Sequence, residues 1–142
     1  LTNIQAAVGV AQMENLDEYV RIKRGIAERY RKGLADVSGL TLPTEAPWAF
    51  STFWLYTILV DKAGYGMDSR FLQRALAEQN IQARPLWAPI HTLLPYRDCQ
   101  AYRIEVADRL YRDALSLPCS VGLGQADQER VITTVHALAH SR

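Results

Sequence analysis

The sequence has little of what marks a secreted, membrane-spanning or nucleic-acid-binding protein. Its only cysteines, Cys99 and Cys119, form neither a CxxC pair nor a cysteine–histidine spacing, which excludes a disulfide framework and a zinc motif. No apolar run reaches the roughly 18 residues that a membrane helix needs. The formal net charge of +1 gives no reason to expect a nucleic acid or an acidic membrane as a partner. These absences favour a cytoplasmic globular protein.

Motifs for self-contained catalysis are also missing from the sequence. The glycines of VGLG, at 121–124, are too few and wrongly spaced for a phosphate-binding loop. No serine–histidine–aspartate order and no carboxylate cluster stands out. His136 and His140 have the spacing of two metal ligands on a helix, but no third ligand lies near them in the sequence. We therefore predict surface histidines, no metal site and no catalytic residue in this chain.

Helical periodicity dominates the first quarter of the sequence. Thr2 to Gln5 has the pattern of a capping box, in which each side chain bonds the other residue's backbone N–H. Apolar residues then recur at helical spacing as far as Val37, and Ser38–Gly39 supplies a stop signal. This pattern predicts one helix of over thirty residues.

The rest of the sequence predicts short strands between helices. Expected strands lie at 53–61, 81–84 and 115–118, and expected helices at 68–79, 104–114 and 125–139. The inward face of the helix at 68–79 is expected to carry Phe71, Leu72, Ala75 and Leu76. Trp48 and Trp54 lie beside or within a buried-strand pattern, so we expect both in the core. The predicted fold class is α/β, with a long N-terminal helix and a small sheet against which helices pack.

The most informative segment for function is RPLWAPIHTLLPY, at 84–96. Its three prolines fix the backbone of an irregular loop, so its polar side chains lose little further entropy on binding. Arg84 can fork onto a phosphate or carboxylate, Trp87 offers a flat face to a sugar or base, and His91 can donate or accept a proton. The alternative is a proline-rich connection whose tryptophan plugs the core and whose arginine is a surface charge.

Four blocks of the sequence together resemble a known family. They are LTNIQAAVGVAQMENLDEY, FWLYTILVD, IQARPLWAPIHTLLPY and LSLPCSVGLGQADQERVI. In order and spacing they resemble the C-terminal part of the sugar aminotransferases of the DegT/DnrJ/EryC1/StrS family. The resemblance implies the small C-terminal α/β domain of a fold-type I aminotransferase at 39–142, with 1–38 as a helix linking it to a large domain upstream. It would also explain why the sequence opens on a helix cap without a methionine.

The family implies an activity for the full-length parent. Its members use pyridoxal 5′-phosphate to transfer an amino group from glutamate to a keto sugar linked to a nucleotide, for surface polysaccharides or other amino sugars. The cofactor forms an imine with a lysine, and the enzymes are homodimers with the active site at the subunit boundary. The lysines of this sequence, Lys23, Lys32 and Lys62, do not stand in the family's imine-forming context. The chain alone is therefore expected to be inactive.

The resemblance assigns only a few site residues to this chain. The loop that lines the sugar-nucleotide pocket in relatives corresponds to Arg84, Pro85, Leu86 and Trp87, and His91 corresponds to the histidine of a PxH motif. Asn3, at a helix N-terminus where exposed N–H groups favour anions, is expected near the cofactor pocket.

Two other interpretations remain open. Some relatives have histidine in place of the lysine and dehydrate or deoxygenate the sugar, so the upstream residue decides between the reactions. Alternatively, the chain is a free-standing ligand-binding α/β module, which a start codon immediately before Leu1 would support.

Overall fold

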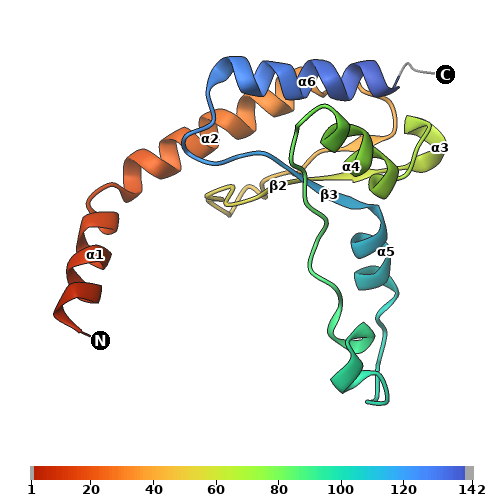
Figure 1. Cartoon of the computed structure of the whole chain (residues 1–142), viewed down its shortest axis with the longest axis horizontal. Coiled ribbons are helices and arrows are strands. Elements are labelled where there is room, and N and C mark those ends of the chain that lie inside the picture. The colour runs from red at the N-terminus through yellow and green to blue at the C-terminus, as the bar shows by residue number, and fades with distance from the viewer. Residues whose placement is uncertain (1, 140–142) are drawn as a thin grey trace.

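The computed structural model describes residues 2–139, which form a small antiparallel sheet with helices packed against it (Figure 1). The three strands, in spatial order, are β1 (Leu40–Thr41), β2 (Tyr56–Val60) and β3 (Ala114–Leu117). The central strand β2 pairs Val60 with Leu40 on one side and Tyr56 with Leu117 on the other. This arrangement confirms the predicted α/β class.

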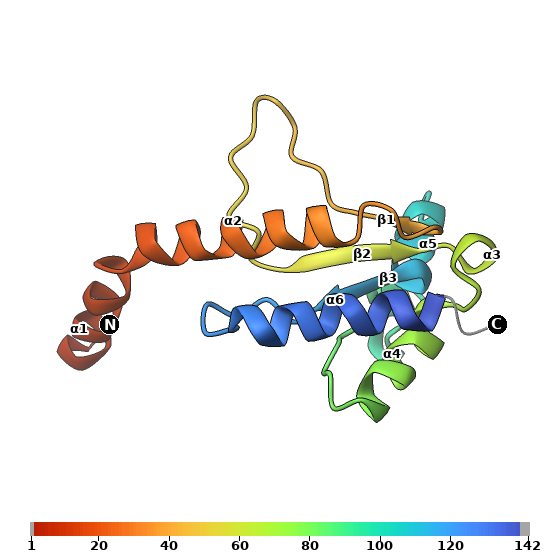
Figure 2. The same cartoon turned by 90° about the horizontal axis from the view of Figure 1, so that it is seen from above.

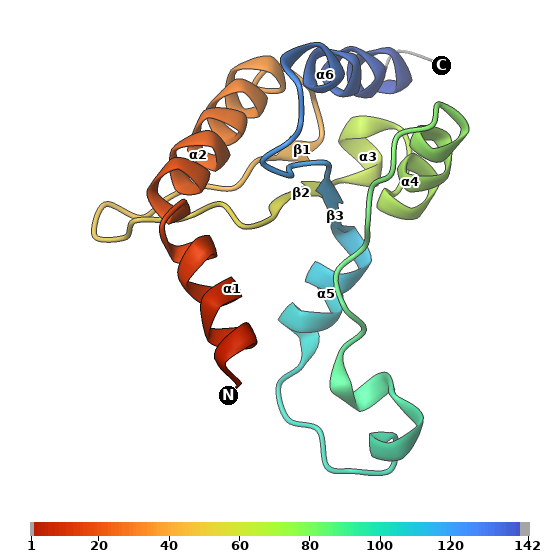
Figure 3. The same cartoon turned by 60° about the vertical axis from the view of Figure 1, so that its left-hand side comes forward.

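The helices are α1 (Asn3–Met13), α2 (Leu16–Gly33), α3 (Lys62–Tyr65), α4 (Ser69–Glu78), α5 (Glu105–Asp113) and α6 (Gln125–Ala139). Helix α1 extends away from the sheet (Figures 1 and 2). Helices α2 and α6 run along one face of the sheet, and α5 lies on the other side (Figures 1 and 3). The predicted helices at 68–79, 104–114 and 125–139 are confirmed as α4, α5 and α6.

The core fills the space between the sheet and helices α2 and α6. Along β2 the side chains alternate, with Tyr56, Ile58 and Val60 buried. Tyr30 of α2 and Val135 of α6 are fully buried in the same cluster. Each such side chain contributes about 1.5–3 kcal/mol of hydrophobic free energy. Helix α2 is therefore an integral part of the packing around the sheet.

The prediction of one helix from 2 to 37 is wrong, although its start is confirmed. Thr2 and Gln5 form the capping box, with Gln5 N donating to Thr2 Oγ1 over 3.3 Å and Thr2 N donating to Gln5 Oε1 over 2.9 Å. The helix breaks between Met13 and Leu16, where the Asn15 amide donates to Ala11 O over 2.8 Å. Asparagine side chains compete in this way for backbone partners, which disfavours a continuous helix.

Helix α4 begins and ends where its sequence signals predict. Asp68 accepts from Phe71 N over 2.8 Å as the N-cap, and Asn80 beyond the C-terminus has a left-handed φ of 57°. The inward placement of Phe71 is wrong, because the ring is 52% exposed. The inward placement of Leu72 and Leu76 is confirmed, since both are fully buried.

The chain between α4 and α5 is mostly irregular. The predicted strand at 81–84 is wrong, since only Arg84 pairs with the sheet, through a single bridge to Ser116. Two 3₁₀ turns follow, at Ile90–Thr92 and Leu94–Tyr96, and the segment extends away from the sheet alongside α5 (Figure 3). The prolines predict this lack of regular structure. A second long loop, between β1 and β2, rises away from α2 (Figure 2).

Candidate functional site

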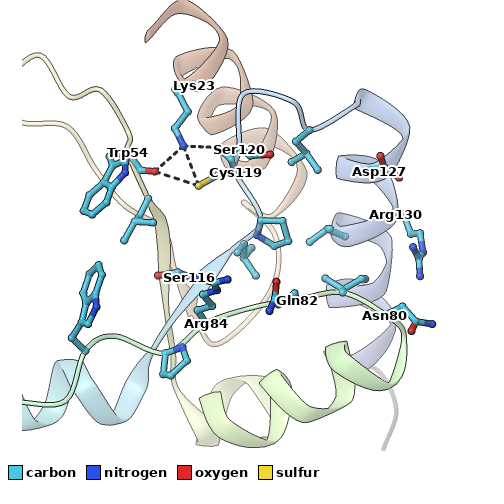
Figure 4. A pocket seen from close by; sticks show the side chains of 18 residues that line it. Lys23, Trp54, Asn80, Gln82, Arg84, Ser116, Cys119, Ser120, Asp127 and Arg130 are labelled. Carbon is cyan, nitrogen blue, oxygen red and sulfur yellow. Dashed lines mark hydrogen bonds between the residues drawn. The ribbon is translucent and has the colours of Figure 1, made fainter. Parts of the chain in front are cut away.

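A cavity of about 720 Å³ opens beside strand β3 (Figure 4). Its walls come from α2, the end of the loop before β2, the segment 80–87, the segment after β3, and α6. This volume is within the range of small-molecule binding sites. Of the residues that the sequence assigns to substrate, Arg84, Pro85 and Trp87 line the cavity.

The backbone of Arg84 is fixed to the sheet while its side chain is free. Arg84 N donates to Ser116 O over 2.9 Å, and Ser116 N donates to Arg84 O over 2.7 Å. Within residues 2–139 the Arg84 side chain is exposed, and its guanidinium has no hydrogen-bond or ion-pair partner. An arginine with a fixed backbone and an unpaired guanidinium is suited to bind a phosphate or carboxylate ligand.

Two tryptophans stand together at the rim of the cavity. The rings of Trp54 and Trp87 are stacked, with centroids 6.0 Å apart and an angle of 19° between their planes. Trp54 is 69% exposed and Trp87 is 71% exposed, so the stack leaves most of both rings open. The prediction that Trp54 lies in the core is wrong, because the buried alternation begins only at Tyr56. Trp48 is also exposed, at 89%, and its predicted burial is wrong too.

Lys23 joins three parts of the cavity wall. From α2, its Nζ donates to Trp54 O over 2.7 Å and to the backbone oxygen of Cys119, and it lies 3.3 Å from Cys119 Sγ (Figure 4). These contacts use the three donors of the ammonium group. Sequence analysis missed Lys23, because it is one of several basic residues in α2 and only the tertiary fold brings Trp54 and Cys119 to it.

The floor of the cavity is supported from the core. Tyr30, fully buried, donates its hydroxyl to Pro118 O over 2.8 Å, which fixes the segment after β3. Burial raises the pKa of Tyr30, so this hydroxyl stays protonated and remains a donor. The wall next to Cys119 is therefore held by two separate side-chain contacts, from Tyr30 and from Lys23.

The charges on the cavity wall favour an anionic ligand. Among the described residues that line it, three side chains are cationic and one is acidic, namely Lys23, Arg84, Arg130 and Asp127. Arg130 donates to the backbone oxygen of Gln79, so the guanidinium of Arg84 is the least engaged of the three cations. The site thus combines an open guanidinium with an aromatic rim.

The other predicted site residues lie off the cavity. Leu86 is half-buried and Asn3 is exposed in α1, and neither lines the cavity wall. His91 places Nε2 3.0 Å from Asp108 Oδ1, which connects the loop to α5. Contact of these residues with a substrate or cofactor stays a prediction.

Residues 2–139 contain no cluster of three or more histidine, cysteine or acidic side chains that could hold a metal ion. His136 Nε2 lies 2.7 Å from Gly33 O and 3.6 Å from Asp36 Oδ1. His140, the other half of the spaced pair, is outside the described residues.

No helix in this part of the chain is long and apolar enough to cross a membrane.

Comparisons with known proteins give matches over nearly the whole chain. The model of the DegT/DnrJ/EryC1/StrS aminotransferase family matches residues 1–136. EpsN of Bacillus subtilis (strain 168) is 35% identical over 145 residues, covering 99% of this chain and 37% of EpsN. The GDP-perosamine synthase of Caulobacter vibrioides is 33% identical over 138 residues, covering 95% of this chain and 36% of the synthase.

Solved structures show the same relationship in three dimensions. The aminotransferase TlmJ from Streptoalloteichus hindustanus matches with a TM-score of 0.84 and 30% identity, over 94% of this chain and 35% of TlmJ. DesV from S. venezuelae, in complex with a ketimine intermediate, matches with a TM-score of 0.89 and 26% identity, over 100% of this chain and 38% of DesV. The chain thus spans little more than a third of the length of these relatives.

Proposed function

The chain belongs to the DegT/DnrJ/EryC1/StrS aminotransferase family, and we propose that its parent protein transfers an amino group from glutamate to a keto sugar carried by a nucleotide. The observation that carries this proposal is the cavity beside β3, whose wall includes Arg84 and Trp87. These are residues that the family resemblance independently assigns to the substrate. The name of the Caulobacter relative, a GDP-perosamine synthase, supports a nucleotide-linked sugar as the substrate class.

In this proposal the chain is the C-terminal part of a fold-type I enzyme. Residues 39–142 are its small domain, and residues 1–38 connect that domain to a larger one. Two copies form a homodimer with the active site at their boundary, and the product serves polysaccharide or other amino-sugar biosynthesis. Two unpaired cysteines, Cys99 and Cys119, agree with a cytoplasmic protein.

The described residues do not provide a complete site for pyridoxal 5′-phosphate. The cofactor needs a lysine whose amine is free to form an imine. Lys23, on the cavity wall, already donates to Trp54 and Cys119, whereas Lys32 pairs with Glu28 over 3.3 Å on the surface. Lys62 is exposed in the short helix α3. We therefore assign the cofactor to the full-length protein, and to this chain a wall of the substrate site.

The first experiment tests the reaction with the full-length protein. Adding pyridoxal 5′-phosphate should produce a visible absorption band from the lysine-bound cofactor, and glutamate should bleach that band. A keto sugar nucleotide should restore the band as the sugar is aminated. A band that glutamate leaves unchanged would contradict transamination, and a histidine at the cofactor-binding position would indicate a sugar dehydratase or deoxygenase instead.

The second experiment tests the role of the cavity. Arg84→Ala and Trp87→Ala should each raise the KM for the nucleotide sugar by about tenfold, since each removes a ligand contact of about 1–3 kcal/mol. The cofactor band should be unchanged. Trp48→Ala is the control, because Trp48 is also an exposed tryptophan but does not line the cavity. A lost band with an unaltered KM would assign these residues to folding or cofactor retention.

A further inference from the structure

We propose that Lys23 and Cys119 form an oxidative cross-link, in which a sulfenamide bond joins the lysine nitrogen to the cysteine sulfur after hydrogen peroxide has oxidised the thiol. The two side chains come from α2 and from the segment after β3, 96 positions apart in the sequence. Nζ lies 3.3 Å from Sγ, so the two atoms that would bond are already in contact (Figure 4). This pair is a modification site that goes beyond the proposed function of the cavity.

Cys119 is largely buried but borders the cavity. The residue is 9% exposed, and it belongs to the wall of the 720 Å³ space. Hydrogen peroxide is little larger than water, so a cavity of this size admits it. The polar contacts of the sulfur within residues 2–139 are Lys23 Nζ and Trp54 O, which lies at 3.5 Å. A thiol in this position is reached only by small reagents.

The cross-link forms in two balanced steps. First, the thiolate of Cys119 attacks one oxygen of hydrogen peroxide, the O–O bond breaks, and the products are a sulfenic acid and hydroxide. Second, Lys23 gives one proton to water, and its nitrogen lone pair attacks Sγ. The S–N bond forms as the S–OH bond breaks, and the departing hydroxide takes a second proton from nitrogen and becomes water. The sulfur loses two electrons, and the peroxide gains them.

The surroundings of Cys119 favour a bond to nitrogen over a disulfide. Sulfenic acids condense with thiols or with nitrogen nucleophiles. The other cysteine, Cys99, is exposed and does not line the cavity. Among the described residues that do line it, Lys23 is the only lysine, and arginine side chains remain protonated and therefore unreactive. Lys23 is thus the side chain in place to capture the oxidised sulfur.

Both partners are held in position before oxidation. The Tyr30 hydroxyl donates to Pro118 O over 2.8 Å, which fixes the backbone next to the cysteine. Lys23 Nζ donates to the backbone oxygens of Trp54 and Cys119. Reacting groups that are already oriented lose little entropy on the way to the bond, which favours an intramolecular reaction over competing ones.

The cross-link changes how the cavity wall is held together. The ammonium group of Lys23 has three N–H donors, and the sulfenamide nitrogen keeps one. Trp54 O and Cys119 O both accept from Lys23 in the reduced protein, so they share a single donor after oxidation. Oxidation therefore weakens one of these two contacts, and a reducing agent restores both.

Peptide mapping of the full-length protein tests the cross-link. The protein is treated with hydrogen peroxide, its free thiols are alkylated, and it is digested with trypsin. Because trypsin does not cut at a modified lysine, we expect peptide 22–24 to be joined to peptide 113–130. The combined mass should be lower by two hydrogen atoms, and dithiothreitol should release the two peptides. Peptide 98–103, which contains Cys99, is the internal control and should be oxidised without gaining a lysine peptide.

Three variants assign the joined species. Lys23→Arg and Cys119→Ser should each abolish it, whereas Cys99→Ser should leave it unchanged. The proposal is overturned if Cys119 remains a thiol at a peroxide concentration that oxidises Cys99. It is also overturned if Cys119 is oxidised to a sulfinic acid without joining Lys23. Loss of two hydrogen atoms from peptide 113–130 alone would place the new bond on a backbone nitrogen, which contradicts the role of Lys23.

Discussion

Three buried tyrosines in the core differ in what their hydroxyl groups contact. Tyr65 donates to Val135 O over 2.6 Å and Tyr30 donates to Pro118 O over 2.8 Å. The Tyr56 hydroxyl has no partner among the described residues, although the residue is only 1% exposed. Burial raises the pKa of Tyr56 to about 12, so its hydroxyl is a protonated, unsatisfied donor. An unsatisfied buried group costs stability, whereas a paired one adds to it.

Removing these hydroxyls should therefore have opposite consequences. Tyr65→Phe should lower the free energy of unfolding by about 1–2 kcal/mol, because it leaves Val135 O without its buried donor. Tyr56→Phe should leave the stability unchanged or raise it slightly. Urea unfolding of the two variants measures both effects. Equal destabilisation by the two substitutions would show that the Tyr56 hydroxyl has a partner in solution.

Single residues could be predicted from the sequence when a local pattern fixed them. Arg84 and Trp87 were placed at a ligand site from the prolines around them and from the family resemblance, and the structure puts both on the cavity wall. Trp54 keeps the alternation of the buried residues Tyr56, Ile58 and Val60 but lies before the strand begins, so the pattern wrongly places it in the core. Lys23 gave no signal, since its contacts lie 31 and 96 positions away along the chain.

Helices α2 and α6 approach closely at a glycine. A methyl group built on Gly33, the last residue of α2, would lie 2.7 Å from Ile132 Cδ1 of α6. Gly25, in the middle of the same helix, has only the Arg29 guanidinium nearby, at 3.8 Å. Of these two glycines in α2, only Gly33 is therefore required by the packing against α6.

The two positions should respond oppositely to alanine. Gly25→Ala should stabilise the protein by about 0.5–1 kcal/mol, the helix propensity gained, and Gly33→Ala should destabilise it by about 1 kcal/mol through overpacking. Adding Ile132→Ala should remove the penalty at Gly33, as a double-mutant cycle would show. Independent, additive effects of Gly33→Ala and Ile132→Ala would contradict the contact.

The loop between β1 and β2 is closed by charged groups at its base. Arg24 of α2 donates to both carboxylate oxygens of Glu45, over 2.7 and 2.9 Å, and to Ser51 O over 2.7 Å. Ser51 N in turn donates to Glu45. These hydrogen bonds, first the one from Arg24 and to a lesser extent the one from Ser51, lower the pKa of Glu45 from 4.5 to about 2.

This loop should open only at very low pH. The pKa of Glu45 is lower in the folded protein than in the unfolded chain. The stabilisation of the loop by the ionised Glu45 is therefore complete above pH 4.5 and is lost as the pH falls toward about 2. The amide resonance of Ser51, followed by nuclear magnetic resonance, should shift with a midpoint near pH 2. Glu45→Gln should abolish that transition. A midpoint near pH 4.5 in the unmodified protein would mean that the contacts do not persist in solution.

The elements of the fold differ in how far the sequence predicts them. Helices α4, α5 and α6 follow from periodicity and caps, because their signals are local. The break before α2 does not, because Asn15 interrupts the helix through its own side chain without disturbing the apolar spacing. The predicted strand at 81–84 is wrong because, among its residues, only Arg84 pairs with the sheet, and residues 81–83 do not.

At the scale of the whole molecule, the apolar side of helix α1 is exposed within residues 2–139. It contains no buried residue, and Ile4 and Val8 on one face are 79% and 59% exposed. An exposed stripe of this kind usually faces another part of a protein or another subunit. In the proposed full-length homodimer, we expect this stripe to be covered.

A charge on that stripe should affect the full-length protein strongly. Ile4→Asp should lower its melting temperature by several degrees and weaken the dimer in light-scattering measurements, because the charge would have to be buried. Gln12→Asp, at the edge of the same face where the side chain is already polar, is the control and should have a smaller effect. Equal melting temperatures for the two variants would show that α1 stays exposed in the intact protein.

The cavity is also a property of the whole molecule. Its walls combine α2, the segments on either side of β3, and α6, which lie far apart in the sequence. The family resemblance predicted that a site exists at Arg84 to Trp87. The positions of Trp54 and Lys23 on the same cavity cannot be predicted from local sequence, since they depend on strand pairing.

The segment that carries Trp87 is anchored on both sides of this tryptophan. Before it, Arg84 pairs with Ser116 of the sheet, and after it, His91 contacts Asp108 of α5 over 3.0 Å. The backbone that carries Trp87 is therefore held at two points, one on the sheet and one on α5. A substitution that removes either contact should therefore displace the indole even though it leaves Trp87 itself unchanged.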